Sequence, residues 1–177
     1  MTAKSIFETN AAEIRKLSQV AKDAAKHRNE GPEQQQAWEE AAQRLRVRYD
    51  KLAFPGGLER QVERLKRGES DAIELAVGFL EADPWFYRSG YIKESLIRVL
   101  KKAPLSDTQC ARLRDVLLAK VDVGGGREFR DYCRLARRLK TEELVAQLAI
   151  KAESQDEKVA QRARWMLEAL GAEAQGD

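Results

Sequence analysis

The chain has 177 residues, of which 43% are hydrophobic and 34% are charged, and its formal net charge is +3. This length and apolar content suffice for one compact domain, or for a core with an appended helical hairpin. No apolar run approaches the roughly 20 residues that a membrane-spanning helix needs. Glu8 and Glu13 lie where a secretory signal would require an apolar segment. We therefore expect a cytoplasmic protein with no membrane segment.

The composition favours helices over strands. Ala, Leu, Glu, Arg, Lys and Gln dominate, and these side chains lose little rotamer freedom in a helix. The two cysteines, Cys110 and Cys133, each fall within an apolar helical pattern, which favours small buried side chains over a disulfide or metal ligands. We expect an all-α fold of about eight or nine helices.

The first two helices are predicted over residues 5–26 and 33–52. Apolar side chains recur in both at steps of three and four, the spacing that places them on one stripe of a helix. In the second helix, Trp38 and Leu45 are predicted to face the core. The connection is short, so the pair should form an antiparallel hairpin. Pro55-Gly56-Gly57 cannot continue a helix, and it divides the chain into an N-terminal hairpin, 1–54, and a second part, 55–177.

The second part is predicted to contain a series of shorter helices. Their expected ranges are 58–67, 70–82, 89–102, 106–121, 127–139, 141–151 and 157–170. Ser106 to Gln109 and Ser154 to Glu157 have the pattern of capping boxes, in which a serine and the residue three positions later bond each other's free backbone groups. Further predicted core residues are Phe79, Leu96, Leu100, Leu113, Leu117, Phe129, Leu139, Leu148 and Leu167.

The helices from about Ser70 to Leu170 resemble HEAT-like repeats. Asp83-Pro84 precedes a helix that ends in Leu-Ile-Arg-Val-Leu at residues 96–100. Residues 156–163, Asp-Glu-Lys-Val-Ala-Gln-Arg-Ala, lead to Leu-Glu-Ala-Leu at 167–170, which looks like the second helix of such a repeat. The resemblance implies a curved stack of helix pairs, an α-solenoid, whose inner helices line a binding surface. It implies no particular activity.

The charge is unevenly distributed along the chain. Residues 91–140 carry 13 basic and 6 acidic side chains, whereas residues 1–90 carry 15 of each and residues 141–177 carry 4 and 8. Five arginines of the predicted helix 127–139 are expected opposite its apolar side chains: Arg127, Arg130, Arg134, Arg137 and Arg138. The planar guanidinium group suits carboxylate and phosphate because it donates paired hydrogen bonds.

Other basic residues are predicted to extend this arginine face in a stacked arrangement. Those assigned to the binding surface are Lys93, Arg98, Lys101 and Lys102. Such a stripe suits an acidic protein surface or a nucleic-acid backbone, and the sequence does not decide between them.

The aromatic run Trp85-Phe86-Tyr87, followed by Arg88, is the other candidate feature. Three consecutive aromatics cannot all face one core, so at least one should be partly exposed and could form a stacking surface with Arg88. We favour packing between repeats over a ligand platform, and assign Trp85, Tyr87 and Arg88 as candidate binding residues. Asp83 is predicted to be the N-cap of a helix that Pro84 begins.

The sequence lacks the residues that most catalytic sites need. His27 is the only histidine, which excludes a histidine metal cluster. The glycine run 124–126 lacks the Lys-Ser/Thr of a phosphate loop and is predicted to be a connection between helices. We expect no enzyme activity, cofactor or metal.

Our first hypothesis is an interaction module that binds an acidic protein, for instance an adaptor, an inhibitor or an immunity-type neutraliser. The second is a nucleic-acid binder that contacts the phosphate backbone. The third is an enzyme resembling HEAT-like DNA glycosylases, with Trp85 or Trp165 and a carboxylate such as Asp83 in a cleft.

Overall fold

The computed structural model describes residues 2–124 and 126–171. Within these residues the protein contains nine α-helices and no strand, which confirms the predicted all-α fold. Gly125, in the predicted glycine connection, and residues 172–177, at the end of the predicted second part, lie outside the described residues. The helices are α1 (Ala3–His27), α2 (Pro32–Ala53), α3 (Leu58–Lys66), α4 (Ser70–Ala82), α5 (Ser89–Leu100), α6 (Asp107–Val123), α7 (Phe129–Arg138), α8 (Glu142–Ala152) and α9 (Glu157–Ala169).

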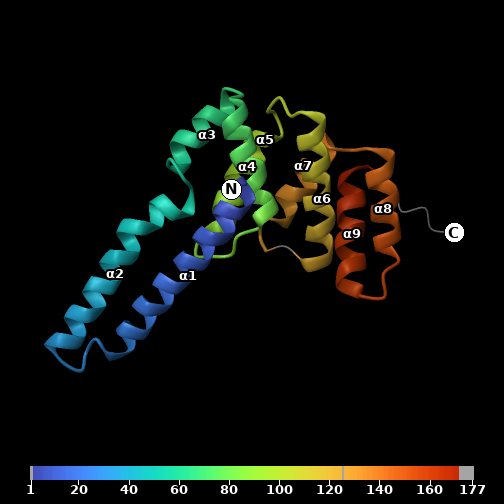
Figure 1. Cartoon of the computed structure of the whole chain (residues 1–177). Helices are drawn as coiled ribbons and strands as arrows, with labels where there is room; N and C mark the ends of the chain where they lie inside the picture. The colour runs from blue at the N-terminus through green and yellow to red at the C-terminus, as the bar shows by residue number, and fades with distance from the viewer. Residues whose placement is uncertain (1, 125, 172–177) are drawn as a thin grey trace.

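The helices α1 and α2 form an antiparallel hairpin that projects from one end of the molecule (Figure 1). Its base is seated on the rest of the protein because α1 packs against α4. Phe7 of α1 contacts Phe79 of α4 edge to face, with ring centroids 4.8 Å apart, and Phe54 lies 5.3 Å from Phe7. The hairpin is therefore joined to the body by a shared aromatic core.

The remaining helices stack in two rows. In one row α4 contacts α6 and α6 contacts α8; in the other, α3, α5, α7 and α9 follow one another. Helices α8 and α9 lie at the end of the molecule opposite the hairpin (Figure 1). Most of these helices bury one apolar side against their neighbours in both rows, whereas α4, which packs against α1, α3, α5 and α6, is buried around most of its circumference. Among the described residues, none of the helices is both long enough and apolar enough to cross a membrane.

The predicted core residues are buried in the body of the protein but not in the outer hairpin. All nine predicted from Phe79 to Leu167 are less than 9% exposed. Trp38 and Leu45, by contrast, are only half-buried, so their assignment to the core was wrong. Both lie on α2, whose main packing partner is α1, so much of each side chain stays open to solvent. Trp38 instead stacks with the Arg28 guanidinium, 5.2 Å from the ring centroid.

The predicted helix caps are only partly confirmed. Ser106 and Gln109 form the predicted capping box, with each side chain bonding the other's backbone. The second predicted box is wrong: Asp156, not Ser154, caps α9, because its carboxylate accepts from two backbone N–H groups of the first turn. Asp83 is not an N-cap either. It ends α4 in the left-handed conformation, with φ 43°.

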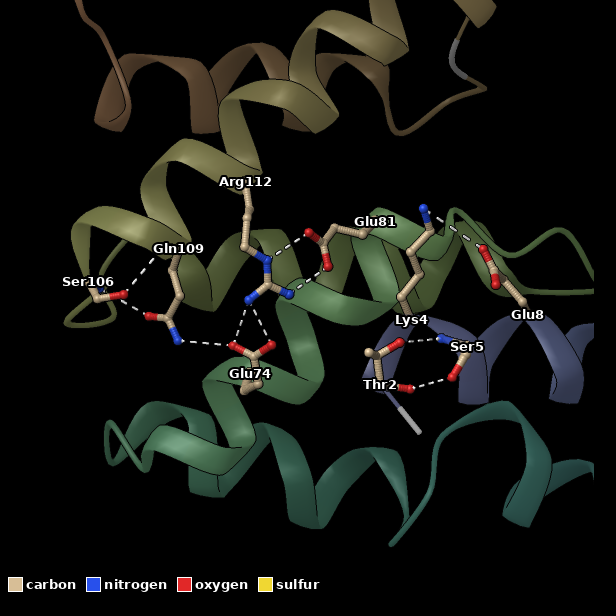
Figure 2. A network of polar contacts seen from close by, with 9 residues as sticks. All are labelled: Thr2, Lys4, Ser5, Glu8, Glu74, Glu81, Ser106, Gln109 and Arg112. Carbon is tan, nitrogen blue, oxygen red and sulfur yellow. Dashed lines mark hydrogen bonds and ion pairs between the residues drawn. The ribbon is translucent and has the colours of Figure 1, made fainter.

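A polar network holds α4 to α6 beside this core. Arg112 of α6 reaches between two glutamates of α4, with nitrogen-oxygen distances of 2.7 Å to Glu74 and 2.6 Å to Glu81 (Figure 2). The capping residue Gln109 also points toward Glu74. Arg112 donates hydrogen bonds to Glu81, and these bonds are the largest cause that raises the pKa of Arg112 above its usual value. Because both contacts involve paired charges, they fix the register of the two helices.

Candidate functional site

The loop between α4 and α5 presents two large aromatic side chains to solvent. Trp85 is 76% and Tyr87 is 77% exposed, whereas Phe86 between them is buried and packs on Phe79. Two hydrogen bonds to backbone carbonyls tie the loop to the hairpin. Tyr49 of α2 donates to the Tyr87 carbonyl, and Arg15 of α1 donates to the Trp85 carbonyl. The exposed aromatics therefore lie on a fixed loop, and the prediction that at least one of the three is exposed is confirmed.

Arginines lie against the neighbouring tyrosine. The Arg127 guanidinium lies 4.4 Å from the ring centroid of Tyr91, which is 51% exposed, and Arg88 lies 6.0 Å from the same ring. Glu94 holds Arg127 in place at 2.8 Å and, mainly through its charge, raises the pKa of Arg127. We call this face the aromatic-arginine surface; its residues are Trp85, Tyr87, Arg88, Tyr91 and Arg127.

A cluster of buried charges lies at the base of this surface, and it corrects the assignment of Lys93. Lys93 is only 3% exposed and cannot contact a partner. Its ammonium group and that of Lys120 approach the same oxygen of Asp83, at 2.6 and 2.5 Å, as ion pairs. Glu128 lies 3.8 Å from Lys93 on the other side. Lys93, Lys120 and Glu128 are buried, whereas the Asp83 side chain is 37% exposed. We call these four residues the buried ion cluster.

This cluster fixes the two loops that carry the surface. Asp83 begins the loop to Trp85, and Glu128 directly follows Arg127 in the sequence. The Glu128 side chain packs so closely that a Cβ on Gly126 would lie 2.8 Å from its carboxylate. Lys120 also lies 5.5 Å from the ring centroid of the buried Tyr132. Breaking a buried ion pair is costly, so the cluster holds both loops in one arrangement.

The rest of the predicted arginine face is exposed but partly engaged. Arg134 pairs with Asp131 at 2.9 Å, and Arg137 donates to the Ala169 carbonyl at 2.6 Å. Arg130 and Arg138 form no ion pair with any described residue. The three other predicted residues, Arg98, Lys101 and Lys102, lie toward the far end of α5, away from Arg127. The predicted stripe thus separates into two regions.

Sequence reasoning missed the burial of both lysines, although a pattern pointed to it. Lys93 lies one turn before Ile97 on the buried face of α5, and Lys120 follows Val116 and Leu117 on that of α6. A lysine in an apolar helical stripe has to pair with a carboxylate. The carboxylate came from Asp83, which the sequence pattern had assigned to a helix start.

The described residues contain no group of three or more His, Cys, Asp or Glu side chains that could hold a metal ion. Comparisons of the chain with family models, with curated proteins and with solved structures found no significant match. The chemistry of the aromatic-arginine surface is therefore the basis for assigning a function.

Proposed function

We propose that the protein is a non-catalytic interaction module that binds an acidic protein partner through the aromatic-arginine surface. The observation that carries this proposal is that Arg88 and Arg127 lie against the exposed rings of Tyr87 and Tyr91, near the exposed Trp85 and next to the buried ion cluster. Trp85 and Tyr87 are each more than three-quarters exposed, although such rings gain most from burial. Tryptophan, tyrosine and arginine are also the residues that most often dominate the binding energy of protein interfaces.

The fixed geometry supports tight binding. A surface whose side chains are already ordered loses less conformational entropy when a partner docks. Here Arg127 is held by Glu94 and Tyr91, and the Trp85 carbonyl accepts a hydrogen bond from Arg15 of α1. A partner carboxylate could accept paired hydrogen bonds from Arg88, which forms no ion pair with a described carboxylate.

Protein is favoured over nucleic acid because the positive charge is interrupted. Glu94 lies against Arg127 and Asp131 against Arg134, so carboxylates lie among the arginines. A phosphate backbone presents one negative charge after another and favours a continuous basic track. Exposed tyrosines with mixed charges suit a protein interface better.

The glycosylase-type hypothesis has less support. Two ammonium groups lie against one oxygen of the Asp83 carboxylate, so its charge is already paired within the protein. Trp165 lies against Phe129, with ring centroids 6.4 Å apart, rather than in a cleft with Asp83. As part of the same proposal, we interpret the pairs α4/α5, α6/α7 and α8/α9 as HEAT-like repeats, on the basis of their two-row stacking.

The double variant Trp85→Ala/Arg127→Glu tests this proposal. It removes the most exposed tryptophan and places a second carboxylate beside Glu94, so it should abolish capture of the natural partner from a cell lysate. The matched control is Lys16→Glu on α1, which makes the same change in net charge at an exposed lysine that forms no ion pair with described residues. Retention of the partner by the double variant, with an unchanged circular dichroism spectrum, would refute the proposal.

Salt dependence separates the nucleic-acid alternative. If binding is to a phosphate backbone, the protein should retain random single-stranded or duplex DNA at low salt, and affinity should fall steeply as salt rises. We expect no such retention.

A further inference from the structure

A groove between α3 and α5 adjoins the aromatic-arginine surface. Its first part, of about 800 Å³, is lined by Tyr49, Arg88 and Tyr91 at the N-terminal end of α5. A second part of about 470 Å³ shares Ser95 with the first. A third part, of about 460 Å³, lies where α3 and α5 end, beside Arg98. The hollows follow one another along α5, so we call them together the α3-α5 groove.

The groove has an apolar floor. Leu58 and Val62 of α3 are only partly buried against the core; Leu58 lines the first two parts and Val62 lines the second. Leu65 and Val99 line its third part, the first from α3 and the second from α5. Leu65 is already buried, but the partly buried Leu58, Val62 and Val99 would gain from further burial, because each buried CH₂ group contributes about 0.8 kcal/mol. An occupant therefore needs apolar side chains along one face.

The third part of the groove is lined by four basic side chains and no acidic one. They are Lys66, Arg98, Lys101 and Lys102. Lys66 pairs with Glu63 at 2.7 Å, but the other three form no ion pair with any described carboxylate. Cations near a helix C-terminus can instead serve the free carbonyl groups of the last turn. No described side-chain hydrogen bond from these three residues does so. Their charge is available to an occupant.

We infer that the α3-α5 groove binds an acidic amphipathic helix. From Tyr91 to Leu100 the groove follows about 14 Å of α5, which matches about two and a half turns of a docked helix. Apolar residues at i, i+3, i+4 and i+7 would contact Leu58, Val62 and Val99. The first two parts of the groove also carry the acidic Asp50, Glu59 and Glu63, beside Arg60 and Arg88. The carboxylates of the docked helix therefore belong mainly at its end beside the third part, where they would meet the free cations. The inference rests on the proposed function in one respect: the helix belongs to the partner of the aromatic-arginine surface, because Tyr91 and Arg88 line both.

The test uses a fluorescently labelled peptide of about 14 residues, four helical turns, with Leu at the four anchor positions and Glu or Ala elsewhere. Fluorescence anisotropy should show binding of this peptide. A peptide with Lys in place of Glu, and one with Ser in place of Leu, should each bind at least about tenfold more weakly. On the protein, Arg98→Glu/Lys102→Glu should weaken binding by about tenfold or more. Lys16→Glu/Lys22→Glu makes the same change in net charge elsewhere and should have no effect.

Three results would overturn the inference: equal binding of the acidic and the Lys-substituted peptide, equal binding by the Arg98→Glu/Lys102→Glu variant, or displacement of the peptide by a single-stranded oligonucleotide of equal charge. The last would show that the groove recognises polyanions rather than an amphipathic helix. The Trp85→Ala/Arg127→Glu variant separates the two proposals, because it should lose the natural partner and still bind the peptide. Its circular dichroism spectrum, and that of the groove variant, should match that of the unaltered protein.

Discussion

Gly78 is the position at which the contact between hairpin and body can be tested with a single methyl group. It lies in the middle of α4 and is buried against the first turn of α1. A Cβ at this position would lie 2.5 Å from the Ala3 Cβ, 3.1 Å from the Lys4 backbone nitrogen and 3.2 Å from the Ala3 carbonyl carbon. Two of these atoms are backbone, so α1 itself would have to move.

Two effects of Gly78→Ala oppose each other. Alanine in place of glycine within a helix contributes about 1 kcal/mol of intrinsic stability. Overpacking of a core costs typically about 1–3 kcal/mol. The contacts here are shorter than carbon atoms tolerate and involve backbone, so the upper part of this range applies. We expect a net loss of about 1–2 kcal/mol, and therefore a melting temperature lower by about 2–8 °C for a chain of this size.

Urea denaturation followed by circular dichroism measures this loss, and a second substitution tests its cause. Ala3→Gly removes the Cβ atom that lies 2.5 Å away. The double variant Ala3→Gly/Gly78→Ala should therefore recover part of the loss, as a coupling between the two sites in a double-mutant cycle. If Gly78→Ala raised the stability instead, α1 would not be seated on α4 as described and our account of the hairpin would fail.

Three further predictions concern the charges and the core. Lys93→Met should lower the free energy of unfolding, measured by urea denaturation, by about 2–4 kcal/mol. The reason is that it removes the ammonium group beside the buried Glu128. A loss below about 0.5 kcal/mol would contradict the buried ion cluster. Burial raises the pKa of Cys133 from its usual 9.0 to about 11, so the folded state holds this proton more tightly and stability should fall as the pH rises from about 9 to 11. A Cys133→Ala variant that showed the same fall would refute this assignment. Arg130→Glu with Arg138→Glu should change stability by less than about 1 kcal/mol, because both side chains are exposed, and a larger loss in thermal unfolding would mean that the arginines support the fold.

The sequence determined those features that depend on neighbours along the chain. The helices, the break at Pro55-Gly56-Gly57 and the capping box at Ser106 follow from local backbone preferences and from short-range periodicity, so they could be predicted without knowing what lies opposite. The same holds for the exposed arginines of α7, because a helix places them opposite the apolar face that its own sequence defines. The exposure of part of the run 85–87 followed from geometry alone.

Only the tertiary structure decided which groups meet across helices. Asp83 fits the pattern of an N-cap, but its partners Lys93 and Lys120 belong to α5 and α6, and a local pattern contains no information about them. The helical periodicity likewise predicted that Trp38 faces the core. It contains no information on how far the body of the protein extends along the hairpin, and the body ends before it reaches Trp38. A side chain's burial and charge partners depend on what packs against its helix, and those contacts join residues far apart in the sequence. For that reason the helices could be predicted residue by residue, whereas the α3-α5 groove and the base of the aromatic-arginine surface could not.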